Sequence, residues 1–159
     1  PEPESLPDFK TRNAPYAHQL GDYYEQPRPI DLRYVNGDPM SRKGEKSTSQ
    51  QVWLRTNGQL PDDPVLPACI VTYASDMTLL DTTILPFGMS WASGDVQMAS
   101  LDHAMWFHRP FRADDWLLYD QTALGTSSAR GLAGGAIFTS DGRLAISVMQ
   151  EGLTRVGRT

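Results

Sequence analysis

Asp76 is the residue whose surroundings most need a chemical explanation. It lies in the segment YASDMTLLDT, inside an apolar run over residues 65–87 whose only charged residues are Asp76 and Asp81. A carboxylate buried without a partner is costly, so the fold must either expose Asp76 at the edge of this run or supply hydrogen-bonding partners for it. The first alternative is a structural role, and the second is typical of a functional carboxylate.

The segment SLDHAMWFHRPF, residues 100–111, contains one aspartate and two histidines. Asp102 and His103 could form an acid–base pair, and a nearby serine would complete a triad. The sequence has no GxSxG nucleophile motif, however, and neighbouring residues of a strand point to opposite faces. His103 and His108, five residues apart, also face opposite sides of a strand and make a poor pair of metal ligands. We therefore expect both histidines to be structural.

Cys69 is the only cysteine, and it lies within the apolar run. No histidine or cationic residue is close to it in sequence, so we expect a small buried hydrophobic side chain rather than a nucleophile. A single cysteine leaves no partner for an intrachain disulfide, which fits a reducing compartment.

Composition argues against several classes of protein. The chain has 159 residues, 40% of them hydrophobic and 21% charged, which indicates one globular domain of ordinary size. Its net charge of −5 argues against nucleic-acid binding, and no uncharged apolar run reaches the roughly 18 residues of a membrane span. No leader with a charged start and an apolar core is visible, so we expect a cytoplasmic protein that binds neither nucleic acid nor membrane.

Two regions of the chain differ in composition. Residues 1–29 contain six prolines, which predicts an extended arm or linker that does not fold alone, and residues 30–159 form the expected domain.

Apolar and polar residues alternate over residues 30–35 and 51–56, which predicts two strands separated by a polar loop. A helix is then predicted from the PDDP segment to about residue 85. Because this helix is apolar on nearly every side, other elements must wrap it.

Strand-forming residues dominate the rest of the chain. The predicted strands are residues 96–108, 116–126, 129–139 and 143–156. An Asp-Gly pair at residues 141–142 predicts a hairpin between the last two. Three glycines, Gly131, Gly134 and Gly135, do not lead from a strand into a helix, so we expect close packing in the sheet rather than a dinucleotide loop. We expect an α+β fold in which an antiparallel sheet wraps one long central helix.

Several motifs, in their order and spacing, resemble the acyl-CoA thioesterase II (TesB-like) family. They are QVWLRTNGQLPDDP, YASDMTLLDT, SLDHAMWFHRPF, WLLYDQ, SSARGLAGG and MQEGLTR, and the resemblance covers residues 30–155. It implies a hotdog fold, which agrees with the arrangement expected from the pattern. Members typically carry two hotdog halves in one chain, and this sequence resembles the linker and the second half. We therefore expect a hotdog unit whose first half is absent here.

The resemblance also implies a catalytic set. The aspartate of the YASD motif, the hydroxyl residue two before the aspartate of the DH motif, and the glutamine of the QEG motif correspond to Asp76, Ser100 and Gln150. In the family these residues position and activate a water that hydrolyses the thioester. A carboxylate can take the proton of the water, while a hydroxyl and a carboxamide can orient it. The resemblance implies no metal or redox cofactor, because coenzyme A enters as part of the substrate.

Other residues of the same motifs are candidates for substrate binding. Arg109, Arg112 and Arg130 offer paired donors that suit the phosphates of coenzyme A, although a solvated surface role explains them as well. We expect Trp106 and Phe107 to contribute to the core and to line the acyl pocket rather than to stack on a nucleobase.

Two alternatives to a hydrolase stay open. Hotdog hydratases and dehydratases typically carry an Asp-His or Glu-His pair near the helix, and the segment YASDMTLLDT contains no histidine. A non-catalytic acyl-binding or assembly module is the second alternative. In each case we expect the chain to associate, either with the missing half or with copies of itself, because hotdog units leave a sheet edge and a helix face open.

Overall fold

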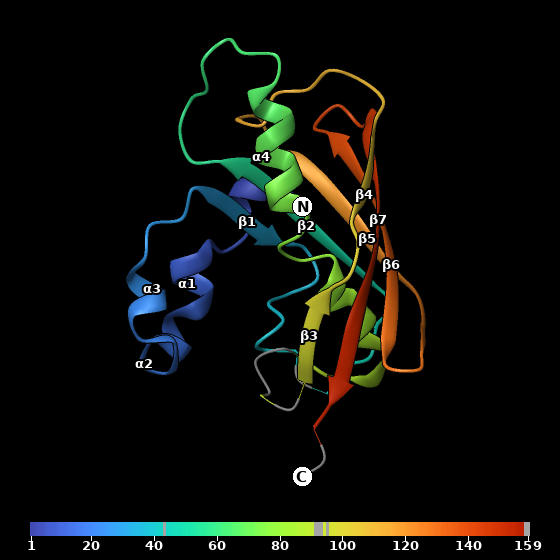
Figure 1. The fold of residues 1–159 in the computed structure, drawn as a ribbon. Helices are drawn as coiled ribbons and strands as arrows, with labels where there is room; N and C mark the ends of the chain where they lie inside the picture. Colours follow the sequence, from blue (N-terminus) through green and yellow to red (C-terminus); the bar gives the residue numbers. More distant parts are fainter. Residues whose placement is uncertain (43, 91–93, 95, 158–159) are drawn as a thin grey trace.

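A curled antiparallel sheet dominates the computed structural model, which describes residues 1–42, 44–90, 94 and 96–157. The strand order is β1-β2-β5-β6-β7-β3, and β4 pairs with β7 at the same edge as β3 (Figure 1). The strands are β1 (Ile30–Tyr34), β2 (Ser49–Thr56), β3 (Val96–Ser100), β4 (Ala104–Phe107), β5 (Leu117–Ser127), β6 (Arg130–Thr139) and β7 (Leu144–Val156). The alternating patterns placed β1 and β2, and the segments rich in strand-forming residues placed β5, β6 and β7, each to within two residues.

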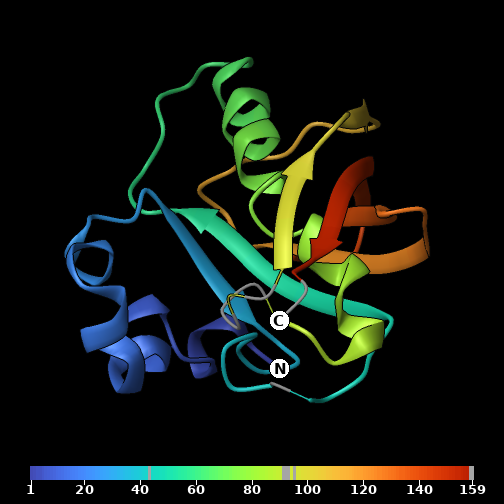
Figure 2. The ribbon, with the colours of Figure 1, turned by 60° about the horizontal axis from the view of Figure 1, so that its bottom comes forward.

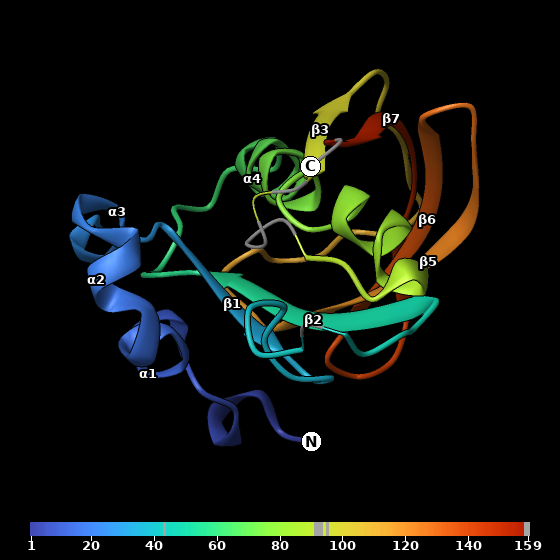
Figure 3. The same cartoon turned by 90° about the horizontal axis from the view of Figure 1, so that it is seen from below.

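The sheet curls around three helical segments, as Figure 3 shows from below. These are α4 (Leu66–Ser75) and the 3-10 helices η3 (Leu80–Thr83) and η4 (Leu85–Phe87). The core between them and the sheet is formed by fully buried apolar side chains, among them Val52, Leu54, Val71, Leu79, Leu117, Ile137 and Ile146. The expected α+β fold, with an antiparallel sheet around a helical core, is confirmed. Within the described ranges, no helix is long and apolar enough to cross a membrane.

The prediction of one long helix through the apolar run is wrong. α4 ends at Ser75, and a turn then leads into η3 and η4. The hydroxyls of Thr82 and Thr83 donate to the carbonyls of Leu79 and Leu80 at 2.7 and 2.8 Å. Such short-range bonds compete with the α-helical ladder and accompany the tighter 3-10 geometry. Because the run stays apolar throughout, hydrophobicity alone did not indicate this change.

Only one face of α4 is covered. Val71, Ala74 and Ser75 are buried, whereas 63% of Tyr73 is exposed. Cys69 is also exposed, so the prediction of a buried thiol is wrong. The physical reason is that the sheet approaches α4 from one side and the opposite side is open in this chain.

Two glycines let η3 lie directly on the sheet. Gly131 of β6 and Gly152 of β7 are cross-strand partners. A Cβ on Gly131 would lie 2.6 Å from Thr83, and one on Gly152 would lie 2.4 Å from Leu80. The expected close packing is therefore present, and it places the turn after α4 against β7.

The arm, residues 1–29, is not the extended segment that its prolines suggested. It forms three short helices, α1 (Phe9–Asn13), α2 (Ala17–Leu20) and α3 (Asp22–Glu25), and two 3-10 turns, η1 (Pro3–Ser5) and η2 (Ala14–Tyr16). Prolines begin η1 and η2, where a missing N–H breaks no helical hydrogen bond. Asp8 caps α1 by accepting a hydrogen bond from the Thr11 N–H at 2.8 Å.

The arm is attached to the β1 side of the sheet. Glu4 accepts a hydrogen bond from the indole N–H of Trp116 at 3.1 Å, and Arg33 donates to the carbonyl of Leu6 at 2.9 Å. Arg12 forms an ion pair with Asp38 at 2.8 Å, and both side chains are largely buried. The arm therefore covers the β1 side and leaves the β3 edge free, as Figure 2 shows.

Candidate active site

Asp76 directly follows the last residue of α4, where the chain leaves the helix. Its side chain is 53% exposed, so the fold places Asp76 at the edge of the apolar run. Asp76 lies on the wall of an open pocket of about 470 Å³, together with residues of α4 and of the segment after β3. The lining residues are Thr72, Tyr73, Asp76, Met77, Ser100, Leu101, Asp102 and His103.

Ser100 and Gln150 both reach the carboxylate of Asp76. Ser100, the last residue of β3, donates from Oγ to Asp76 Oδ1 at 3.1 Å. Gln150 projects from β7, is fully buried, and donates from Nε2 to Ser100 Oγ at 2.8 Å and also to Asp76 Oδ1. Three residues separated by up to 74 positions in sequence thus meet at one carboxylate oxygen.

This arrangement leaves the carboxylate ready to accept a proton. Among the residues that the structure describes, the groups that donate to Oδ1 are the neutral hydroxyl of Ser100 and carboxamide of Gln150, which hold Asp76 in place. The Oε1 atom of Gln150 is buried and has no partner in the described part of the chain. A fixed carboxylate beside unpaired acceptors suits general-base chemistry on a water.

A break in the strand pattern shapes the other wall of the pocket. The predicted strand over residues 96–108 is interrupted after Ser100 and resumes as β4. The N–H groups of Leu101 and Asp102 donate to the carbonyl of Glu151 at 2.9 and 3.3 Å, and Asp102 Oδ1 accepts from the Glu151 N–H at 2.8 Å. Asp102 therefore fastens this loop to β7.

His103 belongs to the pocket, which the sequence analysis did not anticipate. Its Nε2 lies 2.8 Å from Ser75 Oγ, and its Nδ1 lies 3.9 Å from Asp76 Oδ1. The argument from opposite strand faces failed because His103 lies in a loop rather than in a strand. The one feature of the sequence that could have indicated a place for His103 in the site is its position directly after the aspartate of the DH motif.

His108 lies apart from this group. Its Nε2 lies 2.8 Å from Ser147 Oγ, which gives the imidazole a structural partner. Among the residues that the structure describes, no three His, Cys, Asp or Glu side chains cluster in a way that could hold a metal ion.

The predicted aromatic residues do not lie where they were expected. Trp106 is 51% exposed and Phe107 is 47% exposed, and neither lines the pocket beside Asp76. The prediction that they belong to the core is therefore wrong for this chain. β4 is an edge strand that no other described strand covers, so its side chains stay accessible. Phe107 packs on Phe111 with ring centroids 6.3 Å apart.

The three arginines also lie outside the pocket lining. Arg109 donates to the carbonyl of Leu144 at 2.7 Å, and Arg112 forms an ion pair with Asp114 at 2.8 Å. Hydrogen bonds from Arg112 and from the backbone lower the pKa of Asp114 to about 2. Arg130 lies 3.7 Å from Glu151, the neighbour of Gln150 in sequence.

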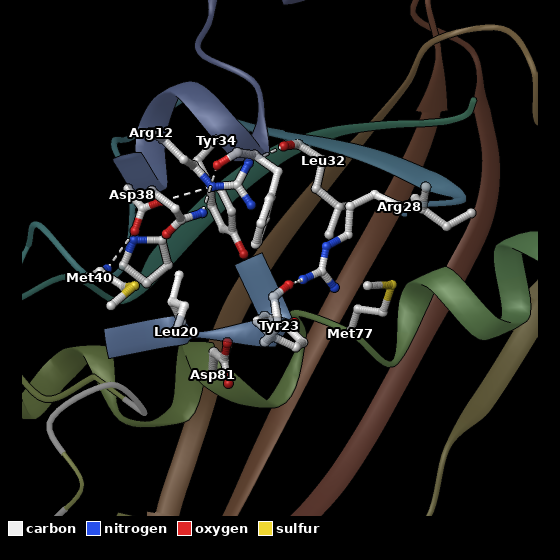
Figure 4. A pocket seen from close by; sticks show the side chains of 14 residues that line it. Arg12, Leu20, Tyr23, Arg28, Leu32, Tyr34, Asp38, Met40, Met77 and Asp81 are labelled. Carbon is white, nitrogen blue, oxygen red and sulfur yellow. Dashed lines mark hydrogen bonds and ion pairs between the residues drawn. The ribbon is translucent and has the colours of Figure 1, made fainter. Parts of the chain in front are cut away.

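A second cavity, of about 280 Å³, lies between the arm and the domain and is lined by residues of both (Figure 4). Met77 lines both this cavity and the pocket beside Asp76. Asp81 lies on its floor, below Leu20 and Tyr23 in this view. Burial raises the pKa of Asp81 to about 7.

Known proteins resemble this chain in sequence. Residues 26–153 match the family model for acyl-CoA thioesterase. Acyl-coenzyme A thioesterase 8 of Homo sapiens is 35% identical over 98% of this chain and 52% of its own length. Acyl-CoA thioesterase 2 of Haemophilus influenzae is 34% identical over 86% of this chain and 48% of its own length. This chain therefore spans about half the length of the curated relatives it matches.

Solved structures of acyl-CoA thioesterases and hot dog proteins also resemble this chain. Acyl-CoA thioesterase II TesB2 from Mycobacterium marinum is 43% identical, with a TM-score of 0.73 over 98% of this chain and 54% of that one. A protein with a hot dog fold from Alicyclobacillus acidocaldarius is 16% identical, with a TM-score of 0.67 over 99% of this chain and 54% of that one, and shares the fold. The chain belongs to the acyl-CoA thioesterase family, and within it to the TesB-like group.

Proposed function

We propose that this chain is a hydrolytic unit of an acyl-CoA thioesterase, which cleaves acyl-CoA to a carboxylic acid and free coenzyme A. The observation that carries this proposal is the meeting of Asp76, Ser100 and Gln150 at one carboxylate oxygen. The family match and the printed names of the relatives support the substrate class. We propose no metal or redox cofactor.

The proposed reaction is a direct attack by water. Asp76 takes a proton from the water as the oxygen forms a bond to the thioester carbon. The carbon–sulfur bond then breaks with its electron pair on sulfur, and the proton held by Asp76 passes to that sulfur. A positioned base of this kind contributes typically about 10²- to 10⁴-fold.

Ser100 and Gln150 assist by fixing geometry. The Ser100 hydroxyl donates to Asp76 and accepts from Gln150, which leaves one lone pair on Oγ for a hydrogen of the water. The carboxamide of Gln150 holds both partners from the buried side. Their contribution is orientation, because a water held in an attack-ready geometry loses less entropy on reaching the transition state.

A second hotdog unit is part of the proposal. Tyr73, Leu101, Trp106 and Phe107 leave an exposed apolar surface on α4 and along the β3–β4 edge. Exposed apolar surface beside an open strand edge is typical of an interface. We propose that this surface packs against another hotdog unit. We also propose that the protein acts in the cytoplasm. A monodisperse monomer in light scattering at micromolar concentration would contradict the pairing.

A hydratase is the second candidate, because His103 lies 3.9 Å from Asp76 and the two could form the Asp-His pair of that class. The two reactions differ in product. A hydrolase releases free thiol from saturated acyl-CoAs, whereas a hydratase consumes the double bond of an enoyl-CoA and leaves the thioester intact.

The experiment measures both products over a series of acyl-CoAs from short to long chains. We expect free thiol from saturated substrates, no loss of the enoyl double bond, and retained ligand binding in Asp76→Asn without turnover. Hydration without thiol release would support the hydratase. Binding without either reaction, also in the presence of a second hotdog unit, would support a non-catalytic module.

A further inference from the structure

Asp76 begins the turn that links α4 to η3, residues 76–79, here called the Asp76 turn. Asp76 and Met77 are exposed, whereas the residues on either side of them, Ser75 and Thr78, are buried. Buried residues at both sides of an exposed pair indicate that the core anchors this turn. The hydrogen bonds to the Asp76 carboxylate can fix its position only if the backbone that carries it is fixed as well.

β5 supplies an anchor on each side of Asp76. Tyr119 and Gln121, two residues apart on the buried face of β5, are both fully buried. The Tyr119 hydroxyl donates to the carbonyl of Ser75 at 3.3 Å, and Gln121 Nε2 donates to the hydroxyl of Thr78 at 2.5 Å. Burial, and to a smaller extent the charge of Asp76, raise the pKa of Tyr119, so its hydroxyl stays protonated and remains a donor.

A chain of hydrogen bonds fixes the orientation of the Gln121 amide. Arg42 has only donors, so its contact with Gln50 at 2.9 Å must end on Gln50 Oε1. Gln50 Nε2 is then the donor to Gln121 Oε1 at 3.1 Å, which leaves Gln121 Nε2 to face Thr78. Gln50 is also fully buried and is the cross-strand partner of Gln121. Flipping either amide would place two donors face to face, so the chain runs in one direction, toward the Asp76 turn.

A glycine makes room for the Tyr119 ring. Gly135 of β6 is the cross-strand partner of Gln121, and a Cβ on Gly135 would lie 2.4 Å from ring carbon Cε2 of Tyr119. Only a glycine at this position therefore lets the ring lie as it does. These residues belong to the motifs WLLYDQ and SSARGLAGG, which contain no member of the proposed catalytic set. Their contacts give both motifs a shared place behind the Asp76 turn.

We propose that Gln121 is a positioning residue for the hydrolysis, which acts through Thr78 and fixes the turn that carries Asp76. Tyr119 fixes the other side of the same turn. This inference rests on the proposed function. Gln121 is not among the described residues that line the pocket beside Asp76, so its effect must pass through the turn. Loss of a fixed base lowers the rate of the chemical step and leaves substrate binding unchanged.

Substitutions that keep side-chain shape test the contact from both ends. Thr78→Val removes the hydroxyl that accepts from Gln121, and Gln121→Met removes the amide but keeps the length of the side chain. We expect kcat for thiol release to fall by about tenfold in both, with KM within about twofold of wild type. Thr78→Ser keeps the hydroxyl and should stay within about threefold. Tyr119→Phe removes one longer hydrogen bond and should lower kcat by a smaller factor than Thr78→Val.

Thr82→Val separates positioning from stability. Thr82 is a buried threonine of the same apolar run, and its hydroxyl donates to the carbonyl of Leu79 at 2.7 Å. We expect Thr82→Val and Thr78→Val both to lower the urea concentration at the unfolding midpoint, and only Thr78→Val to lower kcat per folded molecule. A merely structural role of Gln121 predicts wild-type kcat in both variants, and that result would overturn the proposal.

The Asp76→Asn background tests whether the effect passes through Asp76. In this background Thr78→Val should change the residual thiol release by less than about twofold, because the turn then carries no base to position. A further tenfold loss on top of Asp76→Asn would overturn the positioning role.

The anchoring can also be measured without turnover. The N–H of Met77 donates to the carbonyl of Ala74 at 3.1 Å, and its hydrogen exchange should be faster in Thr78→Val and Gln121→Met than in wild type and Thr82→Val. Unchanged exchange in the first two variants would overturn the role of Gln121 alone. Absence of thiol release from the wild type, also when it is paired with a second hotdog unit, would instead overturn the proposed function and the effect on kcat with it.

Discussion

Asp76 and Asp81 are the two carboxylates of one apolar run, and the fold treats them differently. Asp76 is half-exposed and accepts hydrogen bonds from Ser100 and Gln150. Asp81 lies in the cavity under the arm, where no described residue forms a hydrogen bond or an ion pair with its carboxylate, and burial raises its pKa to about 7. A carboxylate in an apolar setting is either given partners or becomes easier to protonate. Of the two, only Asp76 is held by side-chain donors beside an open pocket, and this placement is the reason we propose it as the base.

Among the partners of Asp76, Gln150 is expected to matter most, because Gln150→Ala removes the buried donor shared by Asp76 and Ser100. We expect kcat for thiol release to fall by about 10²-fold, because a carboxylate without fixed geometry loses most of the benefit of a positioned base. Loss of the buried side chain should also lower the free energy of unfolding by about 1–3 kcal/mol. Steady-state kinetics and urea unfolding measure the two effects.

Gln97→Ala is the matched control, because Gln97 lies on β3 with an exposed side chain. It should leave both quantities close to wild type. Wild-type turnover in a folded Gln150→Ala variant would show that the partners of Asp76 do not matter.

A smaller effect is expected from Ser100→Ala. The variant loses the hydroxyl that donates to Asp76 at 3.1 Å, but Gln150 still holds the carboxylate. We expect about a tenfold loss of kcat, and Ser100→Thr, which keeps the hydroxyl, should stay within about threefold of wild type. If Ser100→Thr were as impaired as Ser100→Ala, volume rather than the hydroxyl would matter at this position.

The last prediction concerns Asp81 and the pH dependence of the free energy of unfolding. Its folded-state pKa of about 7 lies above the unfolded value of 3.8, so the folded protein binds the proton more tightly and the free energy of unfolding falls as pH rises from about 4 to 7. Asp81→Asn removes this dependence. Its stability advantage over wild type should be larger at pH 8 than at pH 5 by about 2–3 kcal/mol.

Urea unfolding at the two pH values measures this difference. Asp62→Asn, at an exposed loop position, serves as the control and should show the same offset from wild type at both. An advantage of Asp81→Asn that does not change with pH would mean that Asp81 is ionised in the folded protein at pH 5.

Most of the sheet could be predicted from alternation in β1 and β2 and from the many strand-forming residues of β5, β6 and β7, because these strands bury one face on the core. The end of α4 could not, since the apolar pattern continues through the 3-10 segments and only the threonine hydroxyls mark the change. The arm was predicted as extended because its prolines were counted without their positions, and two of them, Pro3 and Pro15, lie within the first two residues of short 3-10 turns.

The candidate site was predictable only in part. Motif resemblance identified Asp76, Ser100 and Gln150, which the structure brings together. His103 was missed because its position depends on a break between β3 and β4 that is held by backbone hydrogen bonds to Glu151. Exposed apolar residues such as Trp106 were assigned to the core because hydrophobicity does not distinguish a core from an interface.

The most direct test of the account compares Asp76→Asn with Asp81→Asn in a thiol-release assay on acyl-CoA, with both variants confirmed as folded. We expect Asp76→Asn to lower kcat by about a hundredfold or more, whereas Asp81→Asn should stay within about threefold of wild type. Equal losses in the two variants, or full activity of Asp76→Asn, would contradict the assignment of Asp76 as the base.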